Sequence, residues 1–451
     1  MPYRGSPAPP TARPASPFLL RTLVAVVGVV AAARASALQP LEAFLRGARA
    51  NATDNAEATA ARRQSDAEAD AELGRALPRL TLRGSYTRNQ YDAALDLPGA
   101  GGGPPTVVTL TPLEQLDGSA TLDVPLVDLA RFARVASART SARAAATEAS
   151  STDLRVQALV SQDYHQLLAD VALVASSRRA LAVAQSSLRI AEQRHQAGTT
   201  PLLDVDRARA EVERNVQQLA ATELQVSLVA RALRSATGLA PELEGEVALA
   251  DDLHEEPPLE RFQVPDDRIP SLRAAIQARL ASEERASAQR LSLAPTLSAA
   301  VTERVSDVAG LVGRKASWQG IAALTWSFDL ATVAGIRAQE AASEGAMARE
   351  QRARLAARDA IHAAWMAVLT NVARSRSARV QAQVSARAAD LALARYQAGD
   401  ATQLDLLQAQ RDAFAADAAR IQADADLVNS RAQLRLAAGE SLLEPSGRGA
   451  P

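Results

Sequence analysis

The stretch Arg194-His195-Gln196-Ala197-Gly198 is repeated later in the chain as Arg395-Tyr396-Gln397-Ala398-Gly399. The two copies lie 201 residues apart, and no insertion or deletion interrupts the repeat around them. An ungapped repeat of this kind indicates two equivalent structural units whose length matters. Further pairs related by the same shift are Gly238 and Gly439, Asp204 and Asp405, and Asp128 and Asp329.

The repeat predicts a division of the chain into two halves of one fold. We expect the first repeat at 38–239 and the second at 271–439. Residues 240–270 are rich in Pro, Asp and Glu and are typical of a connector with little regular structure. Residues 440–451 contain Pro, Ser and Gly, so we expect a disordered tail there.

The composition excludes several classes of protein. Lys and Arg number 50 against 51 Asp and Glu, so there is no bulk positive charge that would attract nucleic acid. Cysteine is absent, which excludes disulfides, thiolate metal sites, cysteine nucleophiles and a lipid-modified N-terminal cysteine. Aromatic residues make up only 3% of the chain and alanine is abundant, which favours closely packed helices over a bulky globular core.

The N-terminal segment has the features of an export signal. A basic leader precedes an apolar run over residues 22–33, and Ala35-Ser36-Ala37 has the small-x-small pattern of a signal-peptidase site. The run is shorter than the roughly 20 residues that a spanning helix needs. We therefore predict that residues 1–37 are a signal peptide that is removed, rather than a disordered proline-rich tail.

The first half predicts a helix followed by a β-hairpin. Residues 41–77 alternate Ala with charged residues and end at Pro78, as expected for a helix. Residues 79–127 hold two alternating strands, joined by a long loop that includes the Gly/Pro-rich stretch 99–105. The residues that share the apolar faces of these strands are Leu80, Leu82, Gly84 and Tyr86, and Ala120, Leu122, Val124 and Leu126.

The second half repeats this order with a shorter connection. A helix from Ser271 ends before Pro295, and a hairpin spans 296–328. Both of its strands alternate between an apolar and a polar face. The apolar positions are Leu297, Ala299, Val301 and Val305 in the first strand, and Trp318, Leu324, Trp326 and Phe328 in the second.

Each hairpin leads into a helix too long for a compact domain. Residues 129–195 and 330–396 contain no proline, so at 1.5 Å per residue each predicted helix would reach roughly 100 Å. Val160, Leu167 and Val174 continue in steps of seven to Leu188, which is a coiled-coil seam. These helices therefore need neighbours along their whole length.

Each long helix turns back on itself. We predict tip turns at 196–202 and 397–402, followed by return helices at 203–237 and 403–438. The return helices also carry apolar residues every seven positions, but the seam of the second is displaced by one position relative to the first. The seam residues are Val205, Val212, Leu219, Val226 and Leu233, and Leu407, Phe414, Ile421 and Val428.

The chain offers no recognisable catalytic or cofactor site. The Gly99 to Gly103 run lacks the Lys-Ser/Thr and helix start of a phosphate-binding loop. The run Asp251-Asp252-Leu253-His254-Glu255-Glu256 could attract a divalent cation, but flanking prolines and the lack of helical spacing favour a solvated acidic linker. We therefore expect neither an enzyme nor a cofactor.

Three aromatic residues lie on the apolar strand faces. Tyr86, Trp318 and Trp326 would suit a membrane interface, where a ring with one polar edge is favoured. Packing against a helix explains them equally well, so both interpretations stay open.

Taken together, the two hairpins, the long helices and the repeated turn resemble the TolC-like outer-membrane efflux channels. The resemblance covers the chain from about Leu38 to Gly439. Besides the two turn motifs, the segments that support the resemblance best are Pro125-Leu126-Val127-Asp128 and Ser327-Phe328-Asp329.

This resemblance implies a mainly α fold with a β-barrel portion. In the family, three chains each give four strands to a 12-stranded transmembrane barrel, and their antiparallel coiled-coil helices form an α-barrel across the periplasm. The physics agrees, because four strands with one apolar face cannot close alone in lipid. The implied partners are two further copies of the chain, outer-membrane lipid, a periplasmic adaptor and an inner-membrane transporter.

The resemblance also assigns functions to particular residues. The two turns would lie at the periplasmic end, where the adaptor docks. Asp390 matches the position of an acidic ring that narrows the tunnel, although Leu393 one turn later leaves only one acid per chain. An ion pair between Asp390 and Arg387 is the alternative. The implied docking residues are Arg194, Gln196, Gly198, Asp204, Arg395, Gln397, Gly399 and Asp405.

The function expected from the sequence is a passive outer-membrane conduit with a periplasmic extension. It would be the exit duct of a tripartite efflux or type I secretion system. The alternatives are a periplasmic adaptor-like protein and a structural coiled coil without transport activity. The ungapped repeat disfavours the adaptor, and the two-faced strands with the export signal disfavour the coiled coil.

Overall fold

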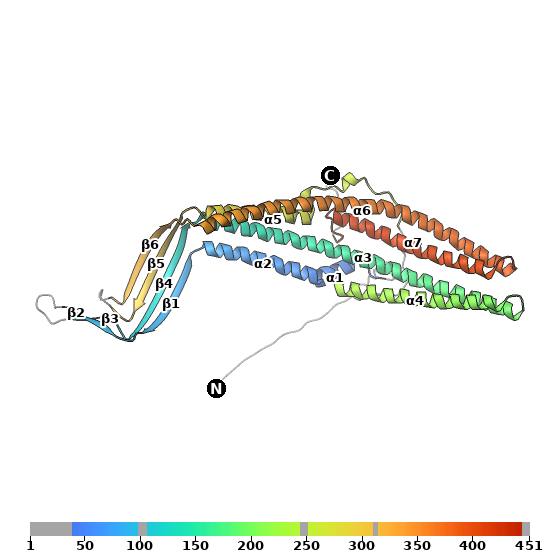
Figure 1. Ribbon diagram of the computed structural model, residues 1–451, viewed down its shortest axis with the longest axis horizontal. Helices are drawn as coiled ribbons and strands as arrows, with labels where there is room; N and C mark the ends of the chain where they lie inside the picture. The colour runs from blue at the N-terminus through green and yellow to red at the C-terminus, as the bar shows by residue number, and fades with distance from the viewer. Residues whose placement is uncertain (1–37, 98–105, 244–250, 310–313, 444–451) are drawn as a thin grey trace, which may run out of the picture.

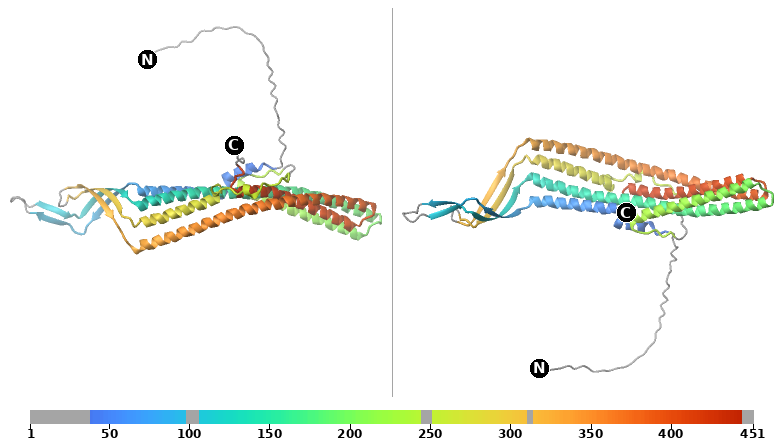
Figure 2. Two further views of the ribbon diagram at one scale, coloured as in Figure 1. Left: turned by 90° about the horizontal axis from the view of Figure 1, so that it is seen from above. Right: turned by 60° about the horizontal axis from the view of Figure 1, so that its bottom comes forward.

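The computed structural model shows a long, mainly helical molecule (Figure 1). A β-sheet occupies one end, and two helix turns occupy the other. Figure 2 shows the same elongated arrangement from two further directions. The predicted signal peptide and the stretch 99–105 lie outside the residues that the structure describes, which are 38–97, 106–243, 251–309 and 314–443.

The two repeats have the same order of elements. Helices α3 and α6 contain 68 and 69 residues, so each is about 100 Å long at 1.5 Å per residue. None of the helices in the described segments combines the length and the apolarity that crossing a bilayer requires. The first repeat comprises α1 Leu41–Asn51, α2 Thr53–Ala76, β1 Arg79–Arg88, β4 Glu114–Val127, α3 Leu129–Gln196 and α4 Leu202–Thr237. The second comprises α5 Pro270–Leu291, β5 Thr296–Ser306, β6 Ala316–Thr325, α6 Leu330–Ala398 and α7 Gln403–Ala437.

The four long strands form one antiparallel sheet in the order β1-β4-β5-β6. Pairing of β4 with β5 joins the hairpins of the two repeats, and β1 and β6 are the two edges. The register places Leu82 opposite Ala120, and Val301 opposite Gly320, on one apolar face. The other face is polar, with a contact of 3.1 Å between the hydroxyls of Thr121 and Thr302.

The connection between β1 and β4 is more ordered than expected. The sequence predicted only a loop here, but β2 Ala93–Leu97 and β3 Thr106–Thr111 form a separate two-stranded sheet. The two strands lie on either side of the Gly/Pro-rich stretch. The composition of that stretch led us to predict a loop for the whole connection. Val107 and Val108 with their neighbouring threonines are strand-favouring residues, and they override that composition.

The long helices of the two repeats start at matching positions because an aspartate caps each of them. Asp128 and Asp329 both cap a helix: their Oδ1 atoms accept hydrogen bonds from the backbone N–H of Arg131 at 2.8 Å and Thr332 at 2.6 Å. These bonds satisfy backbone donors that a helix start leaves free. The 201-residue repeat therefore fixes where each strand ends and each rod begins.

The predicted helix over 41–77 is interrupted. Ala52 is extended, with φ −64° and ψ 129°, and it separates α1 from α2. The break lets α1 dock on α3 and α4, where Gly47 lies so close that an added Cβ would stand 2.7 Å from the carbonyl oxygen of Thr237. The amide of Asn51 holds the same carbonyl at 3.1 Å.

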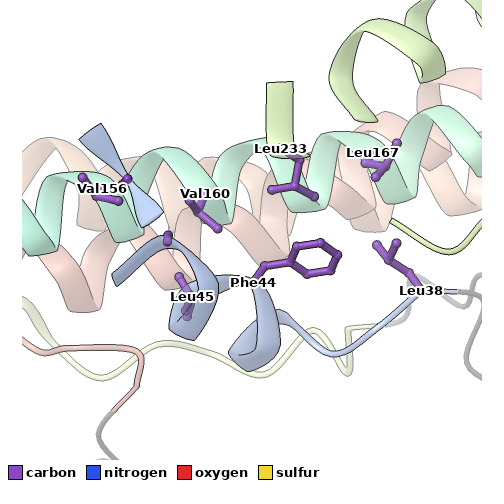
Figure 3. Packing of buried hydrophobic residues seen from close by; sticks show 9 residues of the cluster. Leu38, Phe44, Leu45, Val156, Val160, Leu167 and Leu233 are labelled. Atoms are coloured by element: carbon purple, nitrogen blue, oxygen red, sulfur yellow. The ribbon is translucent and has the colours of Figure 1, made fainter. Parts of the chain in front are cut away.

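Docking of α1 builds the largest apolar cluster. Figure 3 shows Phe44 and Leu45 of α1 facing the long helix α3, with Leu233 of α4 beside them. Val160 and Leu167, the first two seam residues of α3, are fully buried there. Burial of one such side chain stabilises the fold by about 1.5–3 kcal/mol, so α1 clamps this end of the helical hairpin.

Nearer the tips the helices pack through small residues. Ala191 of α3 contacts Val205 and Ala208 of α4, and all three are buried. Ala169 of α3 packs against Ile421 of α7, which joins the two helical hairpins. Short side chains let helix backbones approach closely along a coiled-coil seam.

The tail is ordered where the structure describes it. The side-chain oxygen of Gln157 accepts hydrogen bonds from Ser441 Oγ at 3.1 Å and from the N–H of Leu442 at 2.9 Å. Leu442 and Leu443 also pack against the α1 cluster. The expectation of disorder is therefore wrong for residues 440–443, because two leucines outweigh the polar composition of the segment.

The connector is also more structured than predicted. Its described part from residue 251 contains two short 3₁₀ helices, η1 Leu259–Arg261 and η2 Asp266–Arg268, and packs along α6 and α7. Trp365 of α6 donates a hydrogen bond from Nε1 to the carbonyl oxygen of Pro257 at 3.0 Å. The segment is therefore packed against the helices instead of being a free linker.

Candidate functional site

Both tip turns end their long helices with the same hydrogen-bond motif. Gly198 and Gly399 adopt left-handed φ angles of 74° and 90°, which glycine allows without strain. An added Cβ at either glycine would meet no atom within 4 Å, so the backbone angle alone requires glycine. The outer hydrogen bonds of the two motifs run from Thr199 N to Arg194 O and from Asp400 N to Arg395 O, each 2.9 Å long.

The two turns differ where the return helices start. Thr402 and Asp405 form a capping box, in which Asp405 N donates to Thr402 Oγ1 at 3.2 Å and Thr402 N donates to Asp405 Oδ2 at 3.0 Å. Pro201 occupies the cap position of the first turn and supplies no side-chain cap, so Asp204 instead pairs with Arg207 at 3.2 Å. Sequence reasoning missed Thr402, although the Thr-x-x-Asp spacing was a usable signal.

The capping box sets the charge of the second tip. Hydrogen bonds from the side chain and then the backbone of Thr402 lower the pKa of Asp405, and the nearby cation Arg395 lowers it further. The carboxylate is therefore held in its charged form beside an exposed arginine.

Arg194 ties the two tips together. Its Nη2 donates to the backbone oxygen of Gln397 at 2.8 Å, and its guanidinium carbon lies 4.4 Å from the ring centroid of Tyr396. Such a cation–π contact adds to the hydrogen bond. Arg395, the repeat equivalent of Arg194, is exposed instead. One repeated motif therefore makes an internal contact in the first copy and leaves a surface group in the second.

Buried polar groups lie behind this contact. Tyr396 is only 3% exposed and Gln403 only 2%, and sequence reasoning singled out neither as functional. Within the described residues, the Tyr396 hydroxyl and both amide atoms of Gln403 have no hydrogen-bond partner. Burying a polar group without a partner costs stability.

Farther along the helices, a buried carboxylate joins the two hairpins. Glu211 of α4 has a side chain only 5% exposed, and its Oε2 accepts two hydrogen bonds from Arg411 of α7, at 2.9 and 2.6 Å. Arg214 pairs with the other oxygen of Glu211. Two guanidiniums around one buried carboxylate fix its position.

A second carboxylate makes a similar bridge. Asp417 of α7 accepts a hydrogen bond of 2.6 Å from Ser176 Oγ and pairs with Arg179 at 3.3 Å, both on α3. Burial raises the pKa of Asp417, but hydrogen bonds from Ser176 and Arg420 outweigh it, and the net pKa is lowered. The bridge is therefore ionic at neutral pH.

Asp390 lies beside these bridges. It borders a cavity of about 490 Å³ between the two hairpins, together with Leu393, Phe414 and the bridging residues Glu211 and Asp417. Its carboxylate is exposed, and it forms no ion pair with Arg387 in the described structure. An exposed acid therefore borders the space beside the bridges, and its assignment to the narrowing ring stays a prediction.

The aromatic residues of the sheet are not packed under a helix. Tyr86 is 60% exposed, Trp318 75% and Trp326 63%. Tyr86 and Trp318 lie toward the end of the sheet far from the helices. Trp326 follows β6 at the junction with the helices, donates Nε1 to the oxygen of Leu293 at 2.9 Å, and stands 4.8 Å from the ring of Phe328.

The acidic run of the connector is occupied by an arginine. Arg431 of α7 pairs with Asp251 at 2.9 Å and with Glu256, and its Nη1 lies 2.8 Å from His254 Nε2. Asp251, Asp252 and His254 bring ligand atoms within 4.8 Å of one another, but a guanidinium among them disfavours a cation. The prediction of a solvated linker is wrong for Asp251 and Glu256, which are packed ion-pair partners of Arg431, whereas Asp252 and Glu255 are exposed as expected.

Most of the chain matches one known protein family. The model of the outer membrane efflux protein family matches residues 44–239 and 267–440, which is most of the chain. The chain belongs to that family. It is therefore an outer-membrane efflux channel protein with helices that extend into the periplasm, as the resemblance implied. Family membership also favours a channel over the adaptor-like and coiled-coil alternatives.

Solved structures of outer-membrane channels and of another membrane protein share the fold of this efflux protein. A membrane protein from Pseudomonas aeruginosa is 20% identical, with a TM-score of 0.75 over 91% of this chain and 92% of its own. The Campylobacter jejuni CmeC outer membrane channel is 17% identical, with a TM-score of 0.76 and coverage of 89% and 86%. VceC from Vibrio cholerae is 16% identical, with a TM-score of 0.75 and coverage of 90% and 97%. No curated protein matches the chain by sequence.

Proposed function

We propose that three copies of this efflux protein form one passive conduit, the exit duct of a tripartite efflux or type I secretion system. The observation that carries the proposal is the four-stranded sheet with an exposed apolar face and two unpaired edges, β1 and β6. Lipid cannot hydrogen-bond the backbone groups of those edges, so the sheet must close on further strands. Three copies supply twelve.

The aromatic residues support a membrane position for this barrel. Trp318 and Trp326 lie on the same face of β6 and its extension, eight residues apart, or about 26 Å along the strand at roughly 3.3 Å per residue. At a barrel tilt of about 40° this spans roughly 20 Å of membrane height. The apolar band of outer-membrane barrels is about 25 Å tall between its aromatic girdles. Tyr86 would join Trp318 in the outer girdle.

The tips would be the docking end for a periplasmic adaptor. They lie at the end of the molecule opposite the sheet, so they would point toward the inner membrane (Figure 1). The groups offered there include the exposed side chains of Gln196, Arg395 and Gln397, on turns whose shape Gly198 and Gly399 set. An inner-membrane transporter would supply the energy, and the conduit itself would use none.

Planar-bilayer recording tests the conduit. The purified mature protein should insert as long-lived channels of uniform conductance. Absence of channel steps from a protein that remains folded in detergent would contradict the proposal.

Site-directed cross-linking tests the docking end. The native chain has no cysteine, so a single Gln196→Cys substitution at the tip carries a unique thiol. It should cross-link to a co-expressed adaptor, whereas Thr59→Cys on α2 should not. Equal labelling from both positions would argue against docking at the tips.

Asp390 is proposed as the acid that narrows the periplasmic end. Asp390→Ala should raise the conductance in planar bilayers or weaken cation preference, because it removes one exposed acid per chain from the narrow region. Asp359→Ala, an exposed site on the same helix and away from the cavity, is the control. Unchanged conductance and selectivity in the Asp390 variant would make this residue a surface acid.

A further inference from the structure

The polar face of the four-stranded sheet carries an unbalanced positive charge. Side chains alternate along each strand, so the register of β1, β4, β5 and β6 decides which residues share this face. Within those four strands the face has three cations and two anions. They are Arg79, Arg83 and Arg304, and Asp117 and Asp123.

Two of the three arginines have an acidic neighbour. Arg304 Nη2 lies 3.1 Å from Asp117 Oδ1, and Arg79 Nη2 lies 3.7 Å from Asp123 Oδ2. Arg83 is different: it stands opposite Ser119 of β4, is exposed, and has no ion-pair partner within the described residues. Asp117 lies diagonal to both Arg83 and Arg304 but pairs with Arg304, so Arg83 is the arginine of this face without an ion pair in the described strands.

Closing the barrel would not neutralise Arg83. It lies on the edge strand β1, whose free side would face β6 of a second copy in the proposed trimer. The polar face of β6 carries no charged residue at all between 316 and 325. Its members are Ser317, Gln319, Ile321, Ala323 and Thr325. Whatever register the two strands adopt, β6 offers no acid to Arg83.

We propose that three copies of Arg83 form an anion-attracting belt in the lumen of the barrel. This inference rests on the proposed trimeric conduit. Unpaired charges on the wall of a narrow pore, backed by a low-dielectric barrel, concentrate ions of opposite sign. A guanidinium stays charged at every physiological pH, so the belt acts at all pH values the outer membrane meets. It favours anions and anionic groups of the cargo at the exit, opposite in sign to Asp390 at the other end.

Chemical labelling at a neighbouring position tests the belt locally, without interference from the narrow periplasmic end. Thr81 lies on the same strand and face, two residues from Arg83, and the native chain has no competing cysteine. Thr81→Cys should react faster with a negatively charged methanethiosulfonate reagent, relative to a positively charged one, when Arg83 is present. Arg83→Gln should lower this rate ratio about threefold, given screening at physiological salt.

Matched variants separate charge from other effects. Arg83→Lys should keep the ratio, because it keeps the charge. Arg88→Gln should also leave it unchanged, since Arg88 lies on the opposite face of the same strand and pairs with Glu114 at 3.4 Å. A ratio that is the same with and without the charge at position 83 would overturn the belt.

A further variant distinguishes failure of the belt from failure of the barrel. Leu82→Cys points to the apolar face, so it should be unreactive in membranes while Thr81→Cys reacts. Equal reactivity of the two positions would mean that the sheet does not form a barrel wall, and the belt would fall with it.

Discussion

The two tip turns have the same backbone shape, but their equivalent arginines make different contacts. Gly198 and Gly399 make the same turn, but Arg194 binds the opposite tip while Arg395 stays exposed. An adaptor that docks here would therefore meet two turns of one shape and different charge. The residue equivalence that the sequence shows is not an equivalence of contacts.

Replacing the turn glycine should cost stability through the backbone alone. Gly399→Ala places a Cβ in a left-handed conformation with open space around it, so we expect a loss of about 1 kcal/mol. Gly345 lies inside α6 with no atom within 4 Å of an added Cβ, and Gly345→Ala should stabilise by roughly 0.5–1 kcal/mol. Denaturant unfolding of both variants checks the opposite signs. Equal effects would show that the turn does not require glycine.

His165 predicts a dependence of stability on pH. Burial lowers its pKa, and a backbone hydrogen bond with Ser161, 2.7 Å from Nδ1, opposes that shift only in part. A depressed histidine pKa means that the fold holds the neutral ring, so stability is full above the unfolded value of about 6.5 and falls as pH drops below it. The thermal midpoint should therefore fall less between pH 7.5 and 5.5 in His165→Gln than in the native chain. His362→Gln, at an exposed site, should behave as the native chain does, and equal falls in all three would refute the effect.

Some features of single residues could be predicted from the sequence, and others could not. Glycines at a fixed shift predicted both turns, because positive φ is a local property of the chain. The contact of Arg194 with Gln397 joins residues 203 positions apart, and no local pattern encodes it. Buried polar residues such as Gln403 were also out of reach, because burial depends on the packed helices around them.

At the scale of elements, the two helical hairpins are joined by ion pairs as well as by apolar packing. Glu211 with Arg411 and Asp417 with Arg179 both connect the first hairpin to the second. The apolar cluster that joins the hairpins there has few members, Ala169 of α3 with Ile421 and Ala425 of α7. The ionic bridges therefore hold the relative position of the hairpins near the tips.

Removing the buried carboxylate should loosen that end. Glu211→Ala leaves Arg411 and Arg214 without their shared partner, and since Arg411 is partly exposed we expect a loss of about 2 kcal/mol. Hydrogen–deuterium exchange should rise in α4 and α7 near the tips and stay unchanged around α1. Glu213→Ala, exposed on the same helix, is the control. No change in exchange would mean that apolar packing alone fixes the hairpins.

Helices and strands could be predicted where the apolar residues follow one clear periodicity. The alternation of β1 and β4 and the proline-free rods gave the strands and long helices to within a few residues. The break at Ala52 was missed, because α1 leaves the helix axis to bury Phe44 in a distant groove. The strands β2 and β3 were missed because glycine and proline dominate the composition between them.

At the scale of the whole molecule, one chain is incomplete. Its sheet has an exposed face that is apolar apart from Arg88, Glu114 and Glu303, and two edges without partners in the described chain. Its rods reach about 100 Å from that sheet. Both features are costly for a single chain in a membrane and are removed when copies close around a common axis. Length, which the repeat first indicated, becomes the distance that a channel must bridge across the periplasm.

The mass of the detergent-extracted particle tests this closure most directly. Native mass spectrometry of the mature protein, released from outer membranes in a mild detergent, should give a single species of three chains. A particle of one chain in every mild detergent would contradict the shared barrel and the conduit built on it.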